Sequence, residues 1–302
     1  MAMEETVDGG VDVGAMEMPP RHSEFQRFCS VFFSRWLVIV GLVITVAAIL
    51  LAVCAPIISP YDPNKQDLEQ RLLQPSREHM LGTDALGRDT LSRIIYGSRA
   101  SLMVAVGALF VATLIGVVMG LIAGYFGGIV YMFIMRFIDA LMAFPPILLA
   151  LVIAGLLGGG LTNIVLALGV GLIPSFARLM CAQVLSVKEN DYVMAAHAMG
   201  ASNQRIMLLH IVPNSFPPLI VQVSLWVGFA ILAEAGLSFL GVGIQPPTAA
   251  WGAMVNDGYK YLLTNPVLSF APGGAIMLVV FGFNMIGDGL RDALDPRLRG
   301  KL

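Results

Sequence analysis

Six long apolar segments constrain this chain more than any other feature of its sequence. A helix needs about 20 mostly apolar residues to cross a hydrocarbon layer about 30 Å thick. Segments that meet this requirement lie at about residues 36–58, 101–124, 134–157, 161–182, 215–240 and 268–288. The composition agrees, since 57% of the residues are hydrophobic and only 13% are charged, far from the balance of a soluble domain. The sequence therefore predicts an all-α polytopic membrane protein with six transmembrane helices.

The segments between the apolar runs divide the chain. We expect an N-terminal tail at 1–35, a first span at 36–58, an external segment at 59–100, a five-helix core at 101–290 and a C-terminal tail at 291–302. Within the core lie two loops, 188–213 and 241–267. Eleven of the 18 lysines and arginines fall on the side of the termini. Because cytoplasmic loops carry the excess of Lys and Arg, both tails and loop 188–213 are predicted to be cytoplasmic.

Several classes of function are disfavoured. A net charge of −2 offers no basic excess for nucleic acid. The three cysteines are far apart and the four histidines show no metal-ligand spacing, so we expect no disulfide framework and no metal site. The sequence contains no G-x-x-x-x-G-K-[ST], the loop that cradles nucleotide phosphates. We therefore expect no catalytic residues and no cofactor bound by this chain.

The insert at 188–213, KENDYVMAAHAMGASNQRIMLLHIVP, is polar although it lies between apolar spans. Asn190 or Asp191 can cap a short helix that runs to about Met199, where Gly200 permits the chain to turn. Ser202 can cap a second helix, which we expect Pro213 to end.

The side chains of this insert suggest two faces. The small residues Ala195, Ala196 and Ala198 would let a partner approach the backbone closely. We expect the apolar residues Ile206, Leu209 and Ile211 to pack against the bases of the spans. Such a loop suits the docking of a soluble partner.

The insert resembles the EAA loop of binding-protein-dependent ABC importer permeases, in the register of Ala195, Ala196, Gly200, Ile211 and Pro213. From about Arg27 to the C-terminus the chain resembles the C-type permease of the dipeptide, oligopeptide and nickel importer family. Further matching segments are Leu81–Leu102, Gly124–Gly128, Leu237–Met254 and Phe283–Gly300. Two positions depart from the family: Met194 stands at a usually acidic position, and His197 where arginine is frequent.

The resemblance implies a type I (MetI-like) permease in a bacterial inner membrane, surrounded by lipid. Its partners would be a homologous B-type permease, two P-loop ATPase subunits that hold ATP–Mg, and an extracytoplasmic solute-binding protein. The residues implied to couple to the ATPase are Tyr192, Met194, Ala195, Ala196, His197, Gly200, Ala201, Ile211 and Pro213.

The expected cargo is a short peptide, with nickel chelates, glutathione and small oligosaccharides as alternatives within the family. A stand-alone secondary transporter is a rival, which would show inverted repeats and mid-membrane carboxylates for coupling ions. An intramembrane enzyme is a second rival, but no paired nucleophile and base or metal ligands converge in the spans.

Three further groups of residues are candidates for function. Glu234 lies deep in the fifth span, where it could contact the amine of a cargo or make a structural hydrogen bond. In the external segment, Asp84, Arg88, Asp89 and Arg93 flank an amphipathic run, which we interpret as an interfacial helix bracing the second span, with cargo contact as the alternative. Loop 241–265 could seat the binding protein, close the pore mouth or form a packed cap.

Local polar contacts are also predicted near the span ends. Arg136 and Asp139 are three residues apart and can pair on one helix face. Asn284, Asp288, Arg291 and Asp292 are expected to contact the insert or the partner permease.

Overall fold

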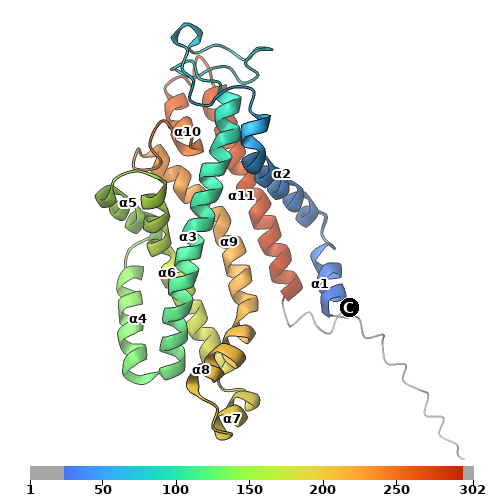
Figure 1. Cartoon of the computed structure of the whole chain (residues 1–302), viewed down its shortest axis with the longest axis vertical. Coiled ribbons are helices and arrows are strands. Elements are labelled where there is room, and N and C mark those ends of the chain that lie inside the picture. Colours follow the sequence, from blue (N-terminus) through green and yellow to red (C-terminus); the bar gives the residue numbers. More distant parts are fainter. Residues whose placement is uncertain (1–23, 295–302) are drawn as a thin grey trace, which may run out of the picture.

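A computed structural model of the chain describes residues 24–294, and helices form nearly all of its regular structure (Figure 1). The predicted tails lie partly outside this range, at 1–23 and 295–302. In chain order the elements are α1 (Glu24–Phe32), α2 (Trp36–Ile58), the 3₁₀ turn η1 (Leu68–Gln70), α3 (Thr90–Phe126), α4 (Gly128–Met142), α5 (Pro146–Leu157), α6 (Leu161–Val187), α7 (Asp191–Ala198), α8 (Asn203–Ile206), the π-helical turn η2 (Met207–Ile211), α9 (Val212–Phe239), α10 (Trp251–Tyr259) and α11 (Val267–Leu294).

Five helices of the described chain are long and apolar enough to cross a membrane. They are α2, α3, α6, α11 and the continuous run from Asn203 to Phe239. Five of the six predicted spans are thereby confirmed. A sixth crossing exists if α4 and α5 together count as one span.

The predicted third span, 134–157, is wrong as a single straight helix. It is divided between α4 and α5, which are bent by 85° relative to each other. Phe144 precedes Pro145, and the residue before a proline is disfavoured in the α conformation. Pro145 itself cannot donate a backbone hydrogen bond, whereas Pro146 suits the first turn of α5, where that donor is not needed. Two adjacent prolines therefore break the span.

Helix α3 is longer than the span predicted at 101–124. Its 37 residues correspond to about 55 Å at 1.5 Å per residue, well beyond a hydrocarbon core of about 30 Å. The helix begins after Asp89, whose carboxylate accepts the backbone N–H of Ser92 at 2.7 Å. The run that we interpreted as a separate interfacial helix is thus the first turns of α3. Arg93 and Ile95 in this run are buried against protein.

The helix that begins at Ser202 does not end at Pro213, contrary to our expectation. It continues through α8, the π-helical turn η2 and α9 without a gap. Pro213 lies in the first turn of α9, directly after the π turn. A π turn already shifts the hydrogen-bonding register, so the missing N–H of a proline is tolerated there.

The centre of the bundle is the contact between α3 and α6. Gly116, Gly120 and Gly124 are four residues apart and so lie on one face of α3. A Cβ added at Gly116 would lie 2.9 Å from the carbonyl oxygen of Ile173, and one at Gly120 would overlap that of Ala177. The absence of side chains on this face lets the two backbones approach closely, as in other membrane helix pairs.

Helix α11 lies between α2 and α9. It approaches α2 closely through another glycine pair, Gly41 and Gly282. Near the same region, Arg35 and Asp292 form an ion pair at 2.9 Å, although Asp292 was expected to contact the insert or a partner. The predicted pairing of Arg136 with Asp139 is also wrong, because Asp139 pairs with Arg178 of α6 at 2.6 Å.

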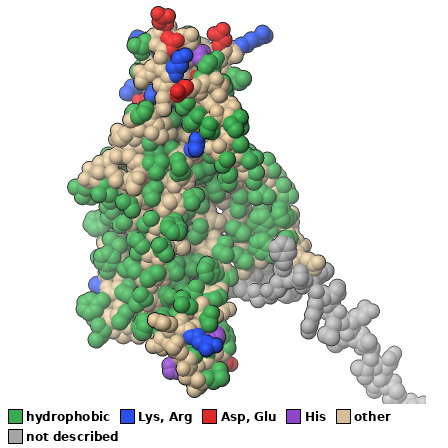
Figure 2. Space-filling view, viewed as in Figure 1, with side chains coloured by type: hydrophobic (Ala, Val, Ile, Leu, Met, Phe, Trp, Pro, Cys, Tyr) green, Lys and Arg blue, Asp and Glu red, His purple; other side chains and the backbone are tan. Residues whose placement is uncertain are grey.

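The two loops predicted to be external meet at one end of the bundle, called here the α10 end (Figure 1). Gln74 donates to the carbonyl of Thr264 at 2.9 Å, and the indole of Trp251 donates to the carbonyl of Ile94 at 2.9 Å. The opposite end carries α7. Charged side chains gather at these two ends, and a band of hydrophobic side chains covers the visible face between them (Figure 2).

Replacing Gly120 by alanine should destabilise the protein, because the new methyl group would meet the backbone of α6. Overpacking of this kind costs about 1–3 kcal/mol. The matched control is Gly155→Ala in α5, where an added Cβ meets nothing within 4 Å. Thermal unfolding of the purified full-length variants in detergent measures the difference. Equal unfolding temperatures for the two variants would show that the α3–α6 contact does not depend on glycine.

Candidate functional site

Helix α7 projects from the end of the bundle opposite α10 (Figure 1). It begins after Asn190, one of the two residues predicted to cap it, but the side chain of Asn190 donates to the carbonyl of Val187 at 2.9 Å instead of capping the helix. Asp191 adds a negative charge to the first turn, where it interacts favourably with the positive end of the helix dipole. We call residues 191–200 the α7 tip.

The α7 tip ends in a Schellman motif that requires glycine. The N–H of Ala201 donates to the carbonyl of Ala196 at 3.1 Å, and the N–H of Gly200 donates to that of His197 at 3.0 Å. Gly200 has φ +81°, in the left-handed region that other residues avoid. A Cβ at Gly200 would meet nothing within 4 Å. The glycine is therefore required by the backbone turn and not by crowding within this chain.

Two side chains of the α7 tip are buried, and one of them packs into the main apolar core. Val193 is 4% exposed and Ala196 is 5% exposed. Val193 belongs to the same apolar cluster as Val187 of α6 and Ile206 of α8. The hydroxyl of Tyr125, at the end of α3, donates to the side chain of Asn203 at 2.8 Å. Val193 thus packs the α7 tip against the end of α6 and against α8, and the Tyr125–Asn203 bond joins α8 to the end of α3.

The outer face of the α7 tip carries large side chains as well as the small side chains of its alanines. Ala195 and Ala198 are exposed, but so are the larger apolar side chains of Tyr192, Met194 and Met199. Met199 is 83% exposed. Met199 was not among the residues predicted to couple to the ATPase. Its position in a polar insert, next to Gly200, is the sequence signal that could have identified it. Apart from Asp191 and His197, the exposed residues of the tip are apolar or small, and they include flexible methionine side chains.

The remaining residues of the predicted coupling set are dispersed. His197 is exposed in the last turn of α7, and Ala201 is half-buried. Ile211 is fully buried in the core, and Pro213 is exposed in the first turn of α9. Of the apolar residues expected to pack inward, Ile206 does so, whereas Leu209 is 61% exposed.

Glu234 of α9 is fully buried and hydrogen-bonded within the chain. Its carboxylate accepts from the hydroxyl of Ser238 at 2.7 Å and from that of Ser101 of α3 at 3.0 Å. The Ser238 oxygen also accepts the backbone N–H of Ile244 at 3.2 Å. The geometry favours the structural alternative for Glu234, in which it joins α9 to α3 and to the following loop.

Metal chemistry has no visible basis in the described residues. Between residues 24 and 294, no three His, Cys, Asp or Glu side chains come together as a candidate metal site.

These features define a class of protein: an all-helical membrane subunit that exposes a short, rigidly capped helix beyond its bundle. Residues 116–300 match the family described as the binding-protein-dependent transport system inner membrane component. Residues 23–75 match the N-terminal transmembrane domain of oligopeptide transport permease C. The chain belongs to the binding-protein-dependent transport permeases, and the resemblance found in its sequence is confirmed.

Relatives of this chain extend over most of its length. It is 46% identical to the dipeptide transport system permease protein DppC of Alkalihalophilus pseudofirmus, over 87% of this chain and 86% of that protein. The chain is 42% identical to the oligopeptide transport system permease protein OppC of Bacillus subtilis, over 89% of this chain and 88% of that protein. The chain is 40% identical to the nickel transport system permease protein NikC of Escherichia coli, over 88% of this chain and 96% of that protein. These relatives are permease subunits and not enzymes.

The fold is also similar to that of a solved transporter. A chain of the MetNI methionine ABC transporter, in inward-facing conformations, matches with a TM-score of 0.54 and 19% identity. The match covers 67% of this chain and 96% of that one. The predicted MetI-like architecture is confirmed.

Replacing Ser238 by alanine should destabilise the protein, because it removes a donor to Glu234 and leaves the N–H of Ile244 without its acceptor. Leaving buried polar groups unpaired costs about 1–3 kcal/mol. Ser224→Ala is the control, since the Ser224 hydroxyl donates only to Val221 in its own helix. Unfolding midpoints in detergent compare the two. If the two variants unfold alike, the Glu234 network does not contribute to stability.

Proposed function

We propose that this chain is a transmembrane subunit of an ATP-driven importer of short peptides and forms half of the translocation pathway. It would pair with a homologous B-type permease, receive cargo from an extracytoplasmic solute-binding protein, and bind two cytoplasmic ATPase subunits that hold ATP–Mg. The observation that carries the proposal is the α7 tip, which Val193 packs against α6 and α8 and which exposes the apolar side chains of Tyr192, Met194 and Met199. An exposed apolar patch with a rigid support is a docking surface.

The proposed orientation places the α7 end in the cytoplasm. The excess of Lys and Arg on the side of loop 188–213 supports this orientation. Arg35, which precedes α2, and Asp292, near the end of α11, form an ion pair, so both chain ends would lie on the cytoplasmic side with α7. The α10 end would then face the solute-binding protein.

Coupling would use the rigidity of the α7 attachment. Val193 packs the tip against Val187 of α6 and Ile206 of α8, so a displacement of α7 by a moving ATPase would be transmitted to α6 and, through α8, to α9. A pair of ATPases that closes on ATP would thereby bias the permease pair between inward-open and outward-open states. Met194 replaces the usual acid, so docking would depend on shape and apolar contact more than on an ion pair.

Peptide cargo is supported by the dipeptide and oligopeptide permeases among the relatives. Nickel and glutathione permeases are also related to this chain, so these remain the alternatives within the class. The alternative function, a stand-alone secondary transporter, would need Glu234 as a binding site for the coupling ion. Both oxygens of that carboxylate already accept hydrogen bonds within the chain, which weighs against the rival.

Replacing Gly200 by valine should uncouple ATP hydrolysis from transport. A β-branched residue is strained at φ +81°, so the Schellman turn would open and the tip would shift. We expect ATP-dependent peptide uptake by the reconstituted importer to fall at least about tenfold, which corresponds to ~1.4 kcal/mol, while insertion into the membrane is unchanged. Gly200→Asn should retain most uptake, because asparagine tolerates this conformation.

Gly127→Val is the matched control for this experiment. Gly127 also has positive φ, at +65°, and open space around its Cβ position, but it lies between α3 and α4. Normal uptake by Gly200→Val, or an equal loss in Gly127→Val, would refute the role of the α7 tip.

Replacing Met199 by glutamate should weaken binding of the ATPase subunits, because a charge would have to be desolvated in an apolar contact. We expect the dissociation constant of the purified ATPase for the permease pair in nanodiscs to rise at least about tenfold. Leu263→Glu is the control, since Leu263 is fully exposed at the α10 end. Unchanged ATPase affinity in Met199→Glu would remove Met199 from the interface.

A further inference from the structure

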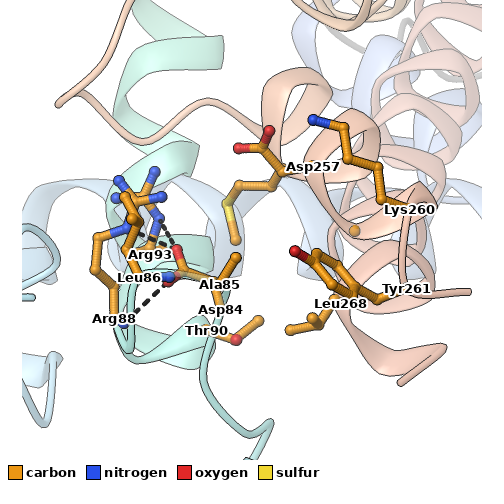
Figure 3. Close-up of a pocket in the computed structure, with 12 residues that line it drawn as sticks. Asp84, Ala85, Leu86, Arg88, Thr90, Arg93, Asp257, Lys260, Tyr261 and Leu268 are labelled. Atoms are coloured by element: carbon orange, nitrogen blue, oxygen red, sulfur yellow. Dashed lines mark hydrogen bonds and ion pairs between the residues drawn. The ribbon is translucent and has the colours of Figure 1, made fainter. Parts of the chain in front are cut away.

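A small cavity lies where the two external loops meet, at the α10 end (Figure 3). Its volume is ≈ 160 Å³. One wall comes from the start of α3 and the segment before it, and the other comes from α10 and the turn that follows. The polar residues that line it are Asp84, Arg88, Arg93, Asp257, Lys260 and Tyr261. Segments about 170 residues apart in the sequence therefore form one charged cavity.

The first wall is built of buried arginines. Arg88 is 7% exposed and Arg93 is 5% exposed. Asp84 holds Arg88 through its Nε atom at 2.6 Å and lies 3.7 Å from the Nε atom of Arg93. The other oxygen of Asp84 accepts the backbone N–H groups of Leu86 and Arg88 at 2.9 and 3.0 Å. The acceptor capacity of Asp84 is thus used to orient the two guanidinium groups.

This wall has more positive charge and more donors than its own chain satisfies. Within this wall two guanidinium groups share the carboxylate of Asp84, and the Asp257 carboxylate of the opposite wall also attracts Arg93. With Lys260 included, the lining of the cavity has an excess of one positive charge. Arg93 donates to the carbonyl of Pro63 at 3.0 Å. In the described part of the chain, the terminal nitrogens of Arg88 have no acceptor. These nitrogens line the cavity and keep free donors there, so a bound anion would be stabilised by charge-assisted hydrogen bonds.

The second wall contributes groups that are free to contact a ligand. Asp257 and Lys260 are exposed, and Tyr261 is half-buried. Figure 3 shows these three side chains across the cavity from Arg88 and Arg93. None of the three side chains makes a hydrogen bond or an ion pair with the described residues, although the Asp257 carboxylate is close enough to attract the Arg93 guanidinium. The charges of Asp257 and Lys260 offset each other, so the excess of the arginine wall determines the charge of the ligand.

We propose that this cavity binds the carboxylate end of a small ligand, with Arg88 and Arg93 as the binding residues. A single carboxylate matches the excess of one positive charge, and its two oxygens match the paired donors of a guanidinium group. The cavity has the volume of about five water molecules, which suits the end of a peptide better than the side of a folded protein. The binding claim depends on the cavity alone, whereas assigning the carboxylate to an imported peptide rests on the proposed function.

The test uses the full-length chain in nanodiscs and N-acetylglycine, which has the carboxylate end of a peptide and no amine. Saturation-transfer NMR should show dose-dependent binding of N-acetylglycine and none of the neutral N-acetylglycinamide. Arg88→Gln should weaken binding at least about tenfold. Arg99→Gln, which changes an exposed arginine of the same helix outside the cavity, should leave binding unchanged.

Two exposed residues keep the test independent of folding. Lys260→Gln should weaken binding of N-acetylglycine by about threefold, and Asp257→Asn should strengthen it by about the same factor, since each removes one charge of known sign beside the carboxylate. Equal binding of the acid and the amide, or the absence of these opposite changes, overturns the proposal. Neither result bears on ATP-dependent uptake, which tests the proposed function separately.

Discussion

The close approach of α3 and α6 is the contact on which the rest of the fold depends. Lipid supplies no hydrophobic force between helices, so association relies on close packing. Gly116, Gly120 and Gly124 provide it by presenting backbone to the backbone and side-chain stems of α6. Helix α6 leads into the α7 tip at one end, and α3 begins in the arginine-lined cavity at the other. One rigid helix pair therefore connects the two ends of the molecule.

The proposed mechanism depends on two features, the α7 tip and the hydrogen bonds of Glu234. The α7 tip has its own stable geometry, because a Schellman turn at Gly200 ends it and Val193 anchors it. It lacks the usual acid but exposes Met194 and Met199, and methionine adapts its shape to a partner surface at small cost. Glu234 is enclosed by Ser101 and Ser238 and so serves to hold α9 against α3. In this account, the ATPase moves the permease through the α7 tip, and the hydrogen bonds of Glu234 keep α9 and α3 together.

Much of this architecture follows from the sequence, because apolar length alone determines which segments can cross a membrane. Apolar length predicted six spans, of which five are single helices and the third is broken by Pro145 and Pro146. The end of the α7 helix at Gly200 was also predicted, but the side-chain cap at Asn190 was not found. Other errors have tertiary causes. The amphipathic pattern at Arg93 predicts an interfacial helix, but this face is covered by other parts of the protein. Asp139 pairs with Arg178 of another helix and not with Arg136 of its own helix. A pairing between helices is not encoded in local spacing. For the same reason the cavity between Arg88 and Asp257 could not be predicted from either loop.

The most direct test of the central claim is to purify the tagged full-length chain gently from its native membrane and identify its companions by mass spectrometry. The account predicts a second, homologous permease and P-loop ATPase subunits in the same complex. Recovery of this chain alone in a transport-active form would contradict it and would favour a stand-alone secondary transporter.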